Sequence, residues 1–200
     1  MLTASQKKAP EGSRPAANNH PVFWGTARDV RYHGLPFGPN RSFFINGFQT
    51  MPTVINFYSV NDDFGWMSNF AAFPLTIDGR VWPTSEHYFQ AQKFADKAVQ
   101  ERIRGTSSPM QAARIGRDRK LTLRRDWESV KVSVMRQALL AKFTQHVELK
   151  ELLLATGDAK LVEQTENDSY WGDGGDGTGK NMLGILLMEL RTSLLSAGEP

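Results

Sequence analysis

The feature that most constrains this fold is a short stretch in the middle of the chain. An Asp78-Gly79 pair separates two short runs, Pro74–Ile77 and Arg80–Trp82. Asp-Gly between such runs predicts a two-residue hairpin, because both turn positions need a positive φ. Thr84 follows almost at once and predicts the N-cap of a helix that extends to about Ala95. The chain is therefore expected to pass from a hairpin directly into a helix.

Most of the remaining elements are predicted to be helices. Apolar periodicity and capping residues indicate helices over 101–104, 110–118, 127–144 (with Asp126 as the cap), 147–155 and 182–195. Short apolar runs indicate strands over 54–58 and 160–166. We therefore expect an α+β class: a mainly helical single domain with a small sheet or hairpin.

Composition limits the kinds of protein that this chain can be. Its 200 residues carry a net charge of +3 and contain no cysteine, which excludes thiol catalysis and cysteine-bound metals. No apolar run is long enough to span a membrane, and the missing cysteines fit a reducing compartment, so we expect a cytoplasmic protein. Residues 1–50 are rich in Pro, Gly, Ser, Asn and Ala and are predicted to be a disordered extension, with the domain at 51–196.

A polar stripe on the helix after Thr84 is the first candidate site. Glu86, Gln90 and Lys93 recur at i, i+4 and i+7, so they lie on one helical face, and Phe89 borders them. The helix N-terminus favours an ionised Glu86, and burial of Lys93 would lower its pKa and favour a nucleophilic amine. An ordinary exposed Glu–Lys stripe remains an equally open interpretation of this spacing.

A glycine-rich loop and a basic run are the other candidates. Trp171 precedes a loop over 172–179 that carries Asp173, and Asn181 opens the last helix. Glycine N–H groups and a helix N-terminus can hold a phosphate, although a purely structural loop fits equally well. The basic run contains Arg114, Arg117, Arg119, Lys120, Arg124 and Arg125. It is either a phosphate or nucleic-acid contact or a solvated face.

Several ordered motifs resemble one known family. They are Ile55–Tyr58, Ser68–Phe70, Trp82–Phe94, Ser107–Met110, Gly116–Arg119, Asp126–Glu128, Asn167–Gly174 and Asn181–Gly184. Together they resemble the YbiA-like, or NADAR, family from about residue 54 to residue 194. The resemblance implies a compact, mainly helical fold that hydrolyses N-glycosidic bonds. In the branch that it most resembles, the substrates are phosphorylated ribosylamino-pyrimidine intermediates of riboflavin synthesis.

The stripe and the resemblance together suggest site residues. We expect Glu86, Lys93 and Asp173 to be catalytic, with Lys93 as either a nucleophile or a phosphate anchor and Asp173 activating water or protonating the leaving base. The expected substrate-binding residues are Asn69, Phe70, Tyr88, Gln90, Arg117, Arg119, Trp171, Gly172 and Asn181. No cofactor and no metal is expected.

The partner is expected to be a phosphorylated small-molecule N-glycoside. Alternatives are a hydrolase that removes ADP-ribose from guanine in nucleic acid, a non-catalytic ADP-ribose or NAD binding module, and a nucleic-acid binder.

Overall fold

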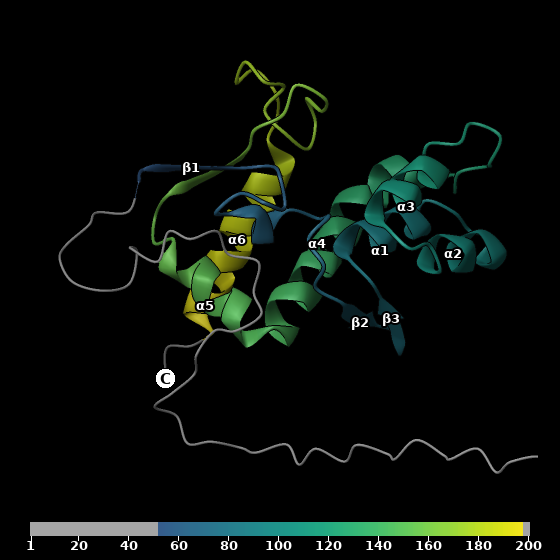
Figure 1. Ribbon diagram of the computed structural model, residues 1–200, viewed down its shortest axis with the longest axis horizontal. Coiled ribbons are helices and arrows are strands. Elements are labelled where there is room, and N and C mark those ends of the chain that lie inside the picture. Colours follow the sequence, from purple (N-terminus) through teal and green to yellow (C-terminus); the bar gives the residue numbers. More distant parts are fainter. Residues whose placement is uncertain (1–51, 198–200) are drawn as a thin grey trace, which may run out of the picture. The chain divides into compact units, whose positions relative to one another are not determined.

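The computed structural model describes residues 52–197, so the predicted disorder of residues 1–50 lies outside the described residues. Four strands and six α-helices, with one 3-10 turn at Gly65–Met67, make up the described chain (Figure 1). The strands are β1 (Val54–Phe57), β2 (Leu75–Ile77), β3 (Arg80–Trp82) and β4 (Lys160–Glu163). The helices are α1 (Ser85–Gln92), α2 (Lys97–Arg104), α3 (Pro109–Gly116), α4 (Trp127–Gln145), α5 (Val147–Ala155) and α6 (Met182–Ser196). This architecture confirms the predicted mainly helical α+β class.

The predicted hairpin is present at β2 and β3. Asp78 and Gly79 take φ values of 51° and 71°, and Leu75 pairs with Trp82 across the antiparallel ladder. Trp82 is fully buried, and Thr84 then caps α1 by accepting a hydrogen bond of 3.3 Å from the His87 N–H. The hairpin therefore anchors the start of α1 in the core.

The second sheet joins segments that are far apart in the sequence. β1 pairs in parallel with β4, with Ile55 opposite Leu161, and α6 packs against β4. Gly184 permits this contact, since a Cβ there would lie 2.1 Å from the Leu161 carbonyl oxygen. The strand ends at Glu163, three residues earlier than predicted, because Thr165 already bonds to the loop that follows.

Two helix starts differ from the predictions. α2 begins at Lys97 rather than at residue 101, because the Asp96 carboxylate accepts the Ala98 N–H at 2.8 Å and caps an earlier turn. Asp126 precedes α4 as predicted but makes no side-chain cap. Its carboxylate instead pairs with Arg124 at 2.7 Å.

α4 lies at the centre of the described chain and contacts α1, α5, α6 and β2. It contributes a fully buried lysine to the core. Lys142 Nζ donates to the carbonyl oxygens of Trp66 and Ser68 at 2.6 and 2.9 Å. These bonds fix the 3-10 turn against α4. The turn ends at Met67, two residues before Asn69. Within residues 52–197, no helix is long and apolar enough to cross a membrane.

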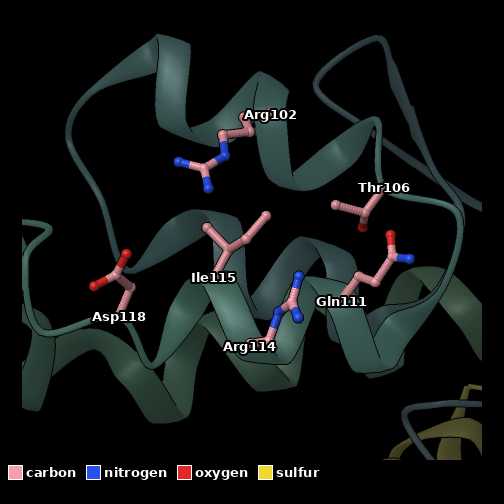
Figure 2. Close-up of a pocket in the computed structure, with 6 residues that line it drawn as sticks. All are labelled: Arg102, Thr106, Gln111, Arg114, Ile115 and Asp118. Atoms are coloured by element: carbon pink, nitrogen blue, oxygen red, sulfur yellow. The ribbon is translucent and has the colours of Figure 1, made fainter.

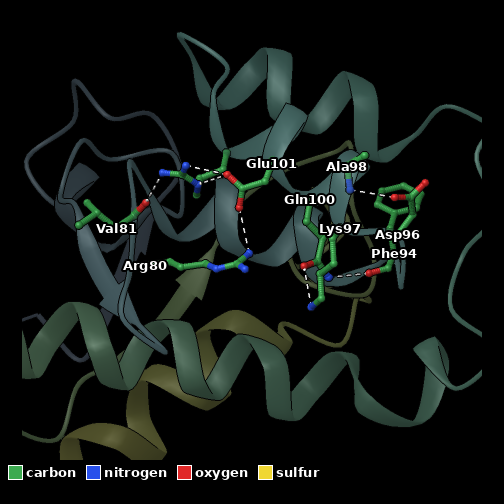
Figure 3. A network of polar contacts seen from close by, with 9 residues as sticks. Arg80, Val81, Phe94, Asp96, Lys97, Ala98, Gln100 and Glu101 are labelled. Carbon is green, nitrogen blue, oxygen red and sulfur yellow. Dashed lines mark hydrogen bonds and ion pairs between the residues drawn. The ribbon is translucent and has the colours of Figure 1, made fainter.

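A polar network holds α2 against its neighbours (Figure 3). Glu101 accepts hydrogen bonds from Arg80 of β3 at 2.9 Å and from Arg104 at 2.6 Å. Gln100 is buried and donates to the Phe94 carbonyl oxygen at 2.7 Å. The network ties the end of α1 and the hairpin to α2, which supports the helix carrying the candidate site.

Candidate active site

The N-terminal turn of α1 places Glu86 in a buried position. Its side chain is only 6% exposed, and its N–H donates to the Asn69 carbonyl oxygen at 3.1 Å. One turn along the helix, Gln90 Nε2 donates to Glu86 Oε1 at 2.8 Å. Burial raises the pKa of the Glu86 carboxyl, while Gln90, Arg117 and Lys93 act to lower it. The stripe is therefore buried and hydrogen-bonded, rather than an exposed Glu–Lys surface.

Lys93 completes the stripe as the residue that ends α1. Its Nζ donates to the Gly116 carbonyl oxygen at 2.6 Å. Burial lowers the pKa of the Lys93 ammonium, with Arg117 adding to this effect and Glu86 opposing it. A lysine with a lowered pKa has a larger fraction of free amine, which is the nucleophilic form.

The end of α3 closes over the stripe. Gly116 is buried against Gln90, and a Cβ at this position would lie 1.9 Å from Gln90 Oε1. The next residue, Arg117, is exposed, yet it acts on the pKa values of both Glu86 and Lys93. Arg119 is exposed as well. Of the two predicted phosphate clamps, Arg117 is the one whose charge acts on Glu86 and Lys93.

The glycine-rich loop docks on the same helix. Trp171 packs edge-on against Phe89, with ring centroids 5.2 Å apart. Gly172 lies so close to the Glu163 carbonyl oxygen that a Cβ would approach it to 2.8 Å. Asp173 Oδ1 accepts hydrogen bonds from the N–H groups of Thr165 and Gly175, both at 2.9 Å. These contacts hold Trp171, Gly172 and Asp173 in one folded loop.

Within residues 52–197, three buried side-chain oxygens have no hydrogen-bond partner: Asn69 Oδ1, Ser85 Oγ and Gln90 Oε1. Asn69 and Gln90 are 7% and 5% exposed, and both residues bond to Glu86, Asn69 through its backbone. Leaving a buried acceptor without a donor costs free energy, so such atoms often mark where a ligand binds. Phe70 is half-buried directly after Asn69. The structure thus brings Asn69 and Gln90 together with Glu86.

Two predicted substrate-binding residues, Tyr88 and Asn181, make contacts within the fold. Tyr88 lies on the opposite side of α1, where it packs edge-on against Trp82 and its hydroxyl donates to Gln137 at 2.6 Å. Asn181 has a left-handed conformation, and its side-chain amide is engaged by β4. Its Oδ1 accepts from the Glu163 N–H at 3.0 Å, and its Nδ2 donates to the Leu161 carbonyl oxygen at 2.8 Å. Neither side chain is brought to the Glu86 carboxyl.

Glu163 is a site residue that sequence reasoning missed. It is the last residue of β4 and is half-buried. Burial raises its pKa to about 8, and the carboxylates of Asp168, Glu86 and Asp173 add to the effect. In the sequence, Glu163 resembles any polar residue at the end of a strand. The acidic residues that act on it, such as Glu86, lie elsewhere in the chain, so local sequence patterns do not reveal them.

Two cavities lie along the basic run. One, of about 420 Å³, lies between α2 and α3, where Figure 2 shows Arg102 and Arg114 beside Ile115 and Asp118. The other, of about 740 Å³, is lined by residues of 92–100 and 122–126. Glu86 lines neither cavity. Within residues 52–197, no cluster of three His, Asp or Glu side chains is arranged to hold a metal ion.

The chain is similar to several known proteins. The NADAR domain family model matches residues 56–195. The N-glycosidase YbiA of Escherichia coli is 68% identical over 142 residues, covering 71% of this chain and 89% of that protein. A riboflavin biosynthesis protein of Vibrio vulnificus is 43% identical over 144 residues, covering 72% of this chain and 39% of that protein.

A solved structure is also similar. The NMR structure of the E. coli protein YbiA has 66% sequence identity and a TM-score of 0.70, covering 74% of this chain and 88% of that one. The family match spans most of the chain, and the structural likeness extends over the domain that carries the Glu86 stripe. The chain therefore belongs to the NADAR family, alongside relatives that are named N-glycosidases.

Proposed function

We propose that this protein hydrolyses the N-glycosidic bond of phosphorylated ribosylamino-pyrimidines, the reactive early intermediates of riboflavin synthesis. The observation that carries the proposal is the buried cluster on α1, in which Gln90 Nε2 bonds to the Glu86 carboxylate at 2.8 Å and Lys93 lies nearby. The names of the N-glycosidase and riboflavin relatives support the same reaction and substrate class.

The charge distribution suits this chemistry. As the bond from ribose to nitrogen breaks, positive charge develops on the anomeric carbon and the ring oxygen. A buried Glu86 carboxylate would stabilise that charge strongly, because little water is present to screen it. Lys93 and Arg117 are the cations beside Glu86, so they lie where a sugar phosphate could bind. Lys93 either attacks the anomeric carbon or anchors this phosphate.

The two unpartnered acceptors support a sugar ligand. Within residues 52–197, Asn69 Oδ1 and Gln90 Oε1 are buried without donors, in two residues that bond to Glu86 through the Asn69 backbone and the Gln90 amide. Ribose hydroxyls are donors, and a bound ribose would satisfy both oxygens. Trp171 and Phe70 are half-buried aromatic residues that are available to stack on the base. We place the enzymatic domain at residues 51–196 and expect the protein to act in the cytoplasm.

A product assay on three substrates tests the proposal. The substrates are a ribosylamino-pyrimidine phosphate, DNA carrying ADP-ribosylated guanine, and NAD. We expect released base and ribose phosphate from the first substrate, with little turnover of the other two. Turnover of the ADP-ribosylated DNA alone would instead assign the nucleic-acid alternative. Tight binding of ADP-ribose with no turnover of any substrate would assign a binding module.

A further inference from the structure

The proposed reaction needs a proton donor that the predicted residues do not provide clearly. An amino-pyrimidine leaves as a neutral amine only if its nitrogen is protonated as the bond breaks. Asp173 was predicted for this role, but its Oδ1 accepts the Thr165 and Gly175 N–H groups. Asp168 Oδ1 similarly accepts the N–H groups of Tyr170 and Trp171, each at 2.8 Å. Both aspartates thus hold the backbone of the loop.

Glu163 is held rigidly but has a free carboxyl. Its N–H donates to Asn181 Oδ1, and its carbonyl oxygen accepts the Asp173 N–H, both at 3.0 Å. Within residues 52–197, its carboxyl forms no hydrogen bond or ion pair. The pairing of β4 with β1 and the docking of the loop place this carboxyl within electrostatic range of Glu86, Asp168 and Asp173. A rigid backbone with an unpaired carboxyl is the arrangement that a proton donor requires.

The surroundings of Glu163 and Glu86 differ in charge. Burial raises the pKa of the Glu86 carboxyl, but the hydrogen bond from Gln90 and the charges of Arg117 and Lys93 oppose that effect and favour the carboxylate. Burial raises the pKa of the Glu163 carboxyl to about 8, and the carboxylates of Asp168, Glu86 and Asp173 add to this effect. In the part of the chain that the structure describes, no cation is among the charges that act on it, so the carboxyl is protonated at neutral pH. Two neighbouring carboxyls with unequal environments divide into an acid and a carboxylate, as in glycosidases generally.

We propose that Glu163 is the general acid that protonates the departing nitrogen of the N-glycoside. This assignment rests on the N-glycosidase function proposed above. The Glu163 O–H proton passes to the glycosidic nitrogen while the bond to the anomeric carbon breaks, and the bonding electron pair stays on that nitrogen. The positive charge left on the sugar is stabilised by the Glu86 carboxylate. A water molecule supplies the hydroxyl for the anomeric carbon, and its proton restores Glu163.

The test compares pH profiles of kcat/KM for wild type and Glu163→Gln on a ribosylamino-pyrimidine phosphate. The wild-type rate should fall as the pH rises through about 8, because the acid loses its proton there. Glu163→Gln keeps the shape of the side chain but has no proton to give. Its kcat at pH 7 should drop by about a hundredfold or more, and the decline near pH 8 should disappear. Glu166→Gln, an exposed carboxyl on the same loop, should leave the profile unchanged.

Chemical rescue separates acid catalysis from a structural role. Glu163→Ala should regain at least about tenfold in rate when a small weak acid such as acetic acid is added, which a folding defect would not allow. A Glu163→Gln enzyme that keeps its decline near pH 8, or a Glu163→Ala enzyme without rescue, would overturn the assignment. A wild-type protein that releases no base at all would overturn the proposed function and the assignment together.

Discussion

Gln90 Nε2 donates a 2.8 Å hydrogen bond to Glu86 Oε1 across one turn of α1. The bond joins two buried side chains whose remaining surroundings come from three separate segments, at Asn69, Gly116 and Glu163. It orients the carboxylate and lowers its pKa, in opposition to the larger effect of burial. The Glu86 geometry is therefore sensitive to anything that displaces the Gln90 amide.

Gly116→Ala should displace that amide. The added Cβ would lie 1.9 Å from Gln90 Oε1 and 3.1 Å from Gln90 Cβ, so the side chain must shift. Loss of a hydrogen bond to a charged group costs about 1.5–3 kcal/mol, which corresponds to a 10- to 100-fold fall in kcat/KM. Steady-state kinetics with thermal unfolding would measure the activity and the fold together.

Gly105→Ala is the matched control for this prediction. It lies at the end of the preceding helix, and its nearest contact would be an ordinary 3.4 Å from Glu101. Its kcat/KM should stay near the wild-type value. An unchanged kcat/KM in Gly116→Ala would show that the Gln90 bond does not matter for turnover.

Lys93 should be trapped by borohydride during turnover if it attacks the sugar. The lowered pKa of its ammonium increases the fraction of free amine, and attack on the opened sugar gives an imine that borohydride reduces. Peptide mass spectrometry should find a ribose phosphate adduct on Lys93 and none in Lys93→Ala.

The control for trapping is Lys97→Ala, which removes an exposed lysine on the neighbouring helix. This variant should still be trapped at Lys93. If Lys93→Ala instead keeps its kcat and only raises KM, and wild type yields no adduct, then Lys93 anchors the phosphate and is not a nucleophile.

Lys142→Met should destabilise the fold by roughly 2–4 kcal/mol above pH 9, because two buried carbonyl oxygens lose their donor. The pKa of Lys142 falls from 10.5 to about 7 on folding through burial. Between those pH values the unfolded chain binds the extra proton, so wild-type stability rises with pH at about 1.4 kcal/mol per unit at most.

Methionine does not titrate, so the stability difference between wild type and variant should depend on pH. It should widen from pH 7 to pH 9 and stay constant below pH 7, as measured by urea unfolding. Lys160→Met, an exposed lysine, should show no such trend. A difference that stayed flat from pH 7 to pH 9 would mean that Lys142 is charged in the folded protein.

Local sequence signals predicted the hairpin and the start of α1 accurately. Asp78 and Gly79 determine their turn through positive φ, and Thr84 caps its helix through one side-chain bond, so neither depends on distant residues. The i, i+4 spacing likewise predicted that Glu86 and Gln90 meet. These features depend only on near neighbours in the chain.

Contacts between distant segments were not predictable in this way. Glu163 acquires its raised pKa through burial in the folded chain and through carboxylates from other parts of the sequence. The sequence suggested that Asn181 binds a ligand. In the structure α6 packs on β4, and the side-chain amide of Asn181 bonds to backbone atoms of β4. A buried Lys142 has no signature in helical periodicity, which treats lysine as a surface residue.

The most direct test of a catalytic Glu86 site is kcat on a ribosylamino-pyrimidine phosphate for wild type, Glu86→Gln and the exposed control Glu151→Gln. Glu86→Gln keeps the size of the side chain and removes its charge, so kcat should fall by about a hundredfold or more while Glu151→Gln matches wild type. A Glu86→Gln enzyme with wild-type kcat and only an altered KM would contradict a catalytic role for this carboxylate.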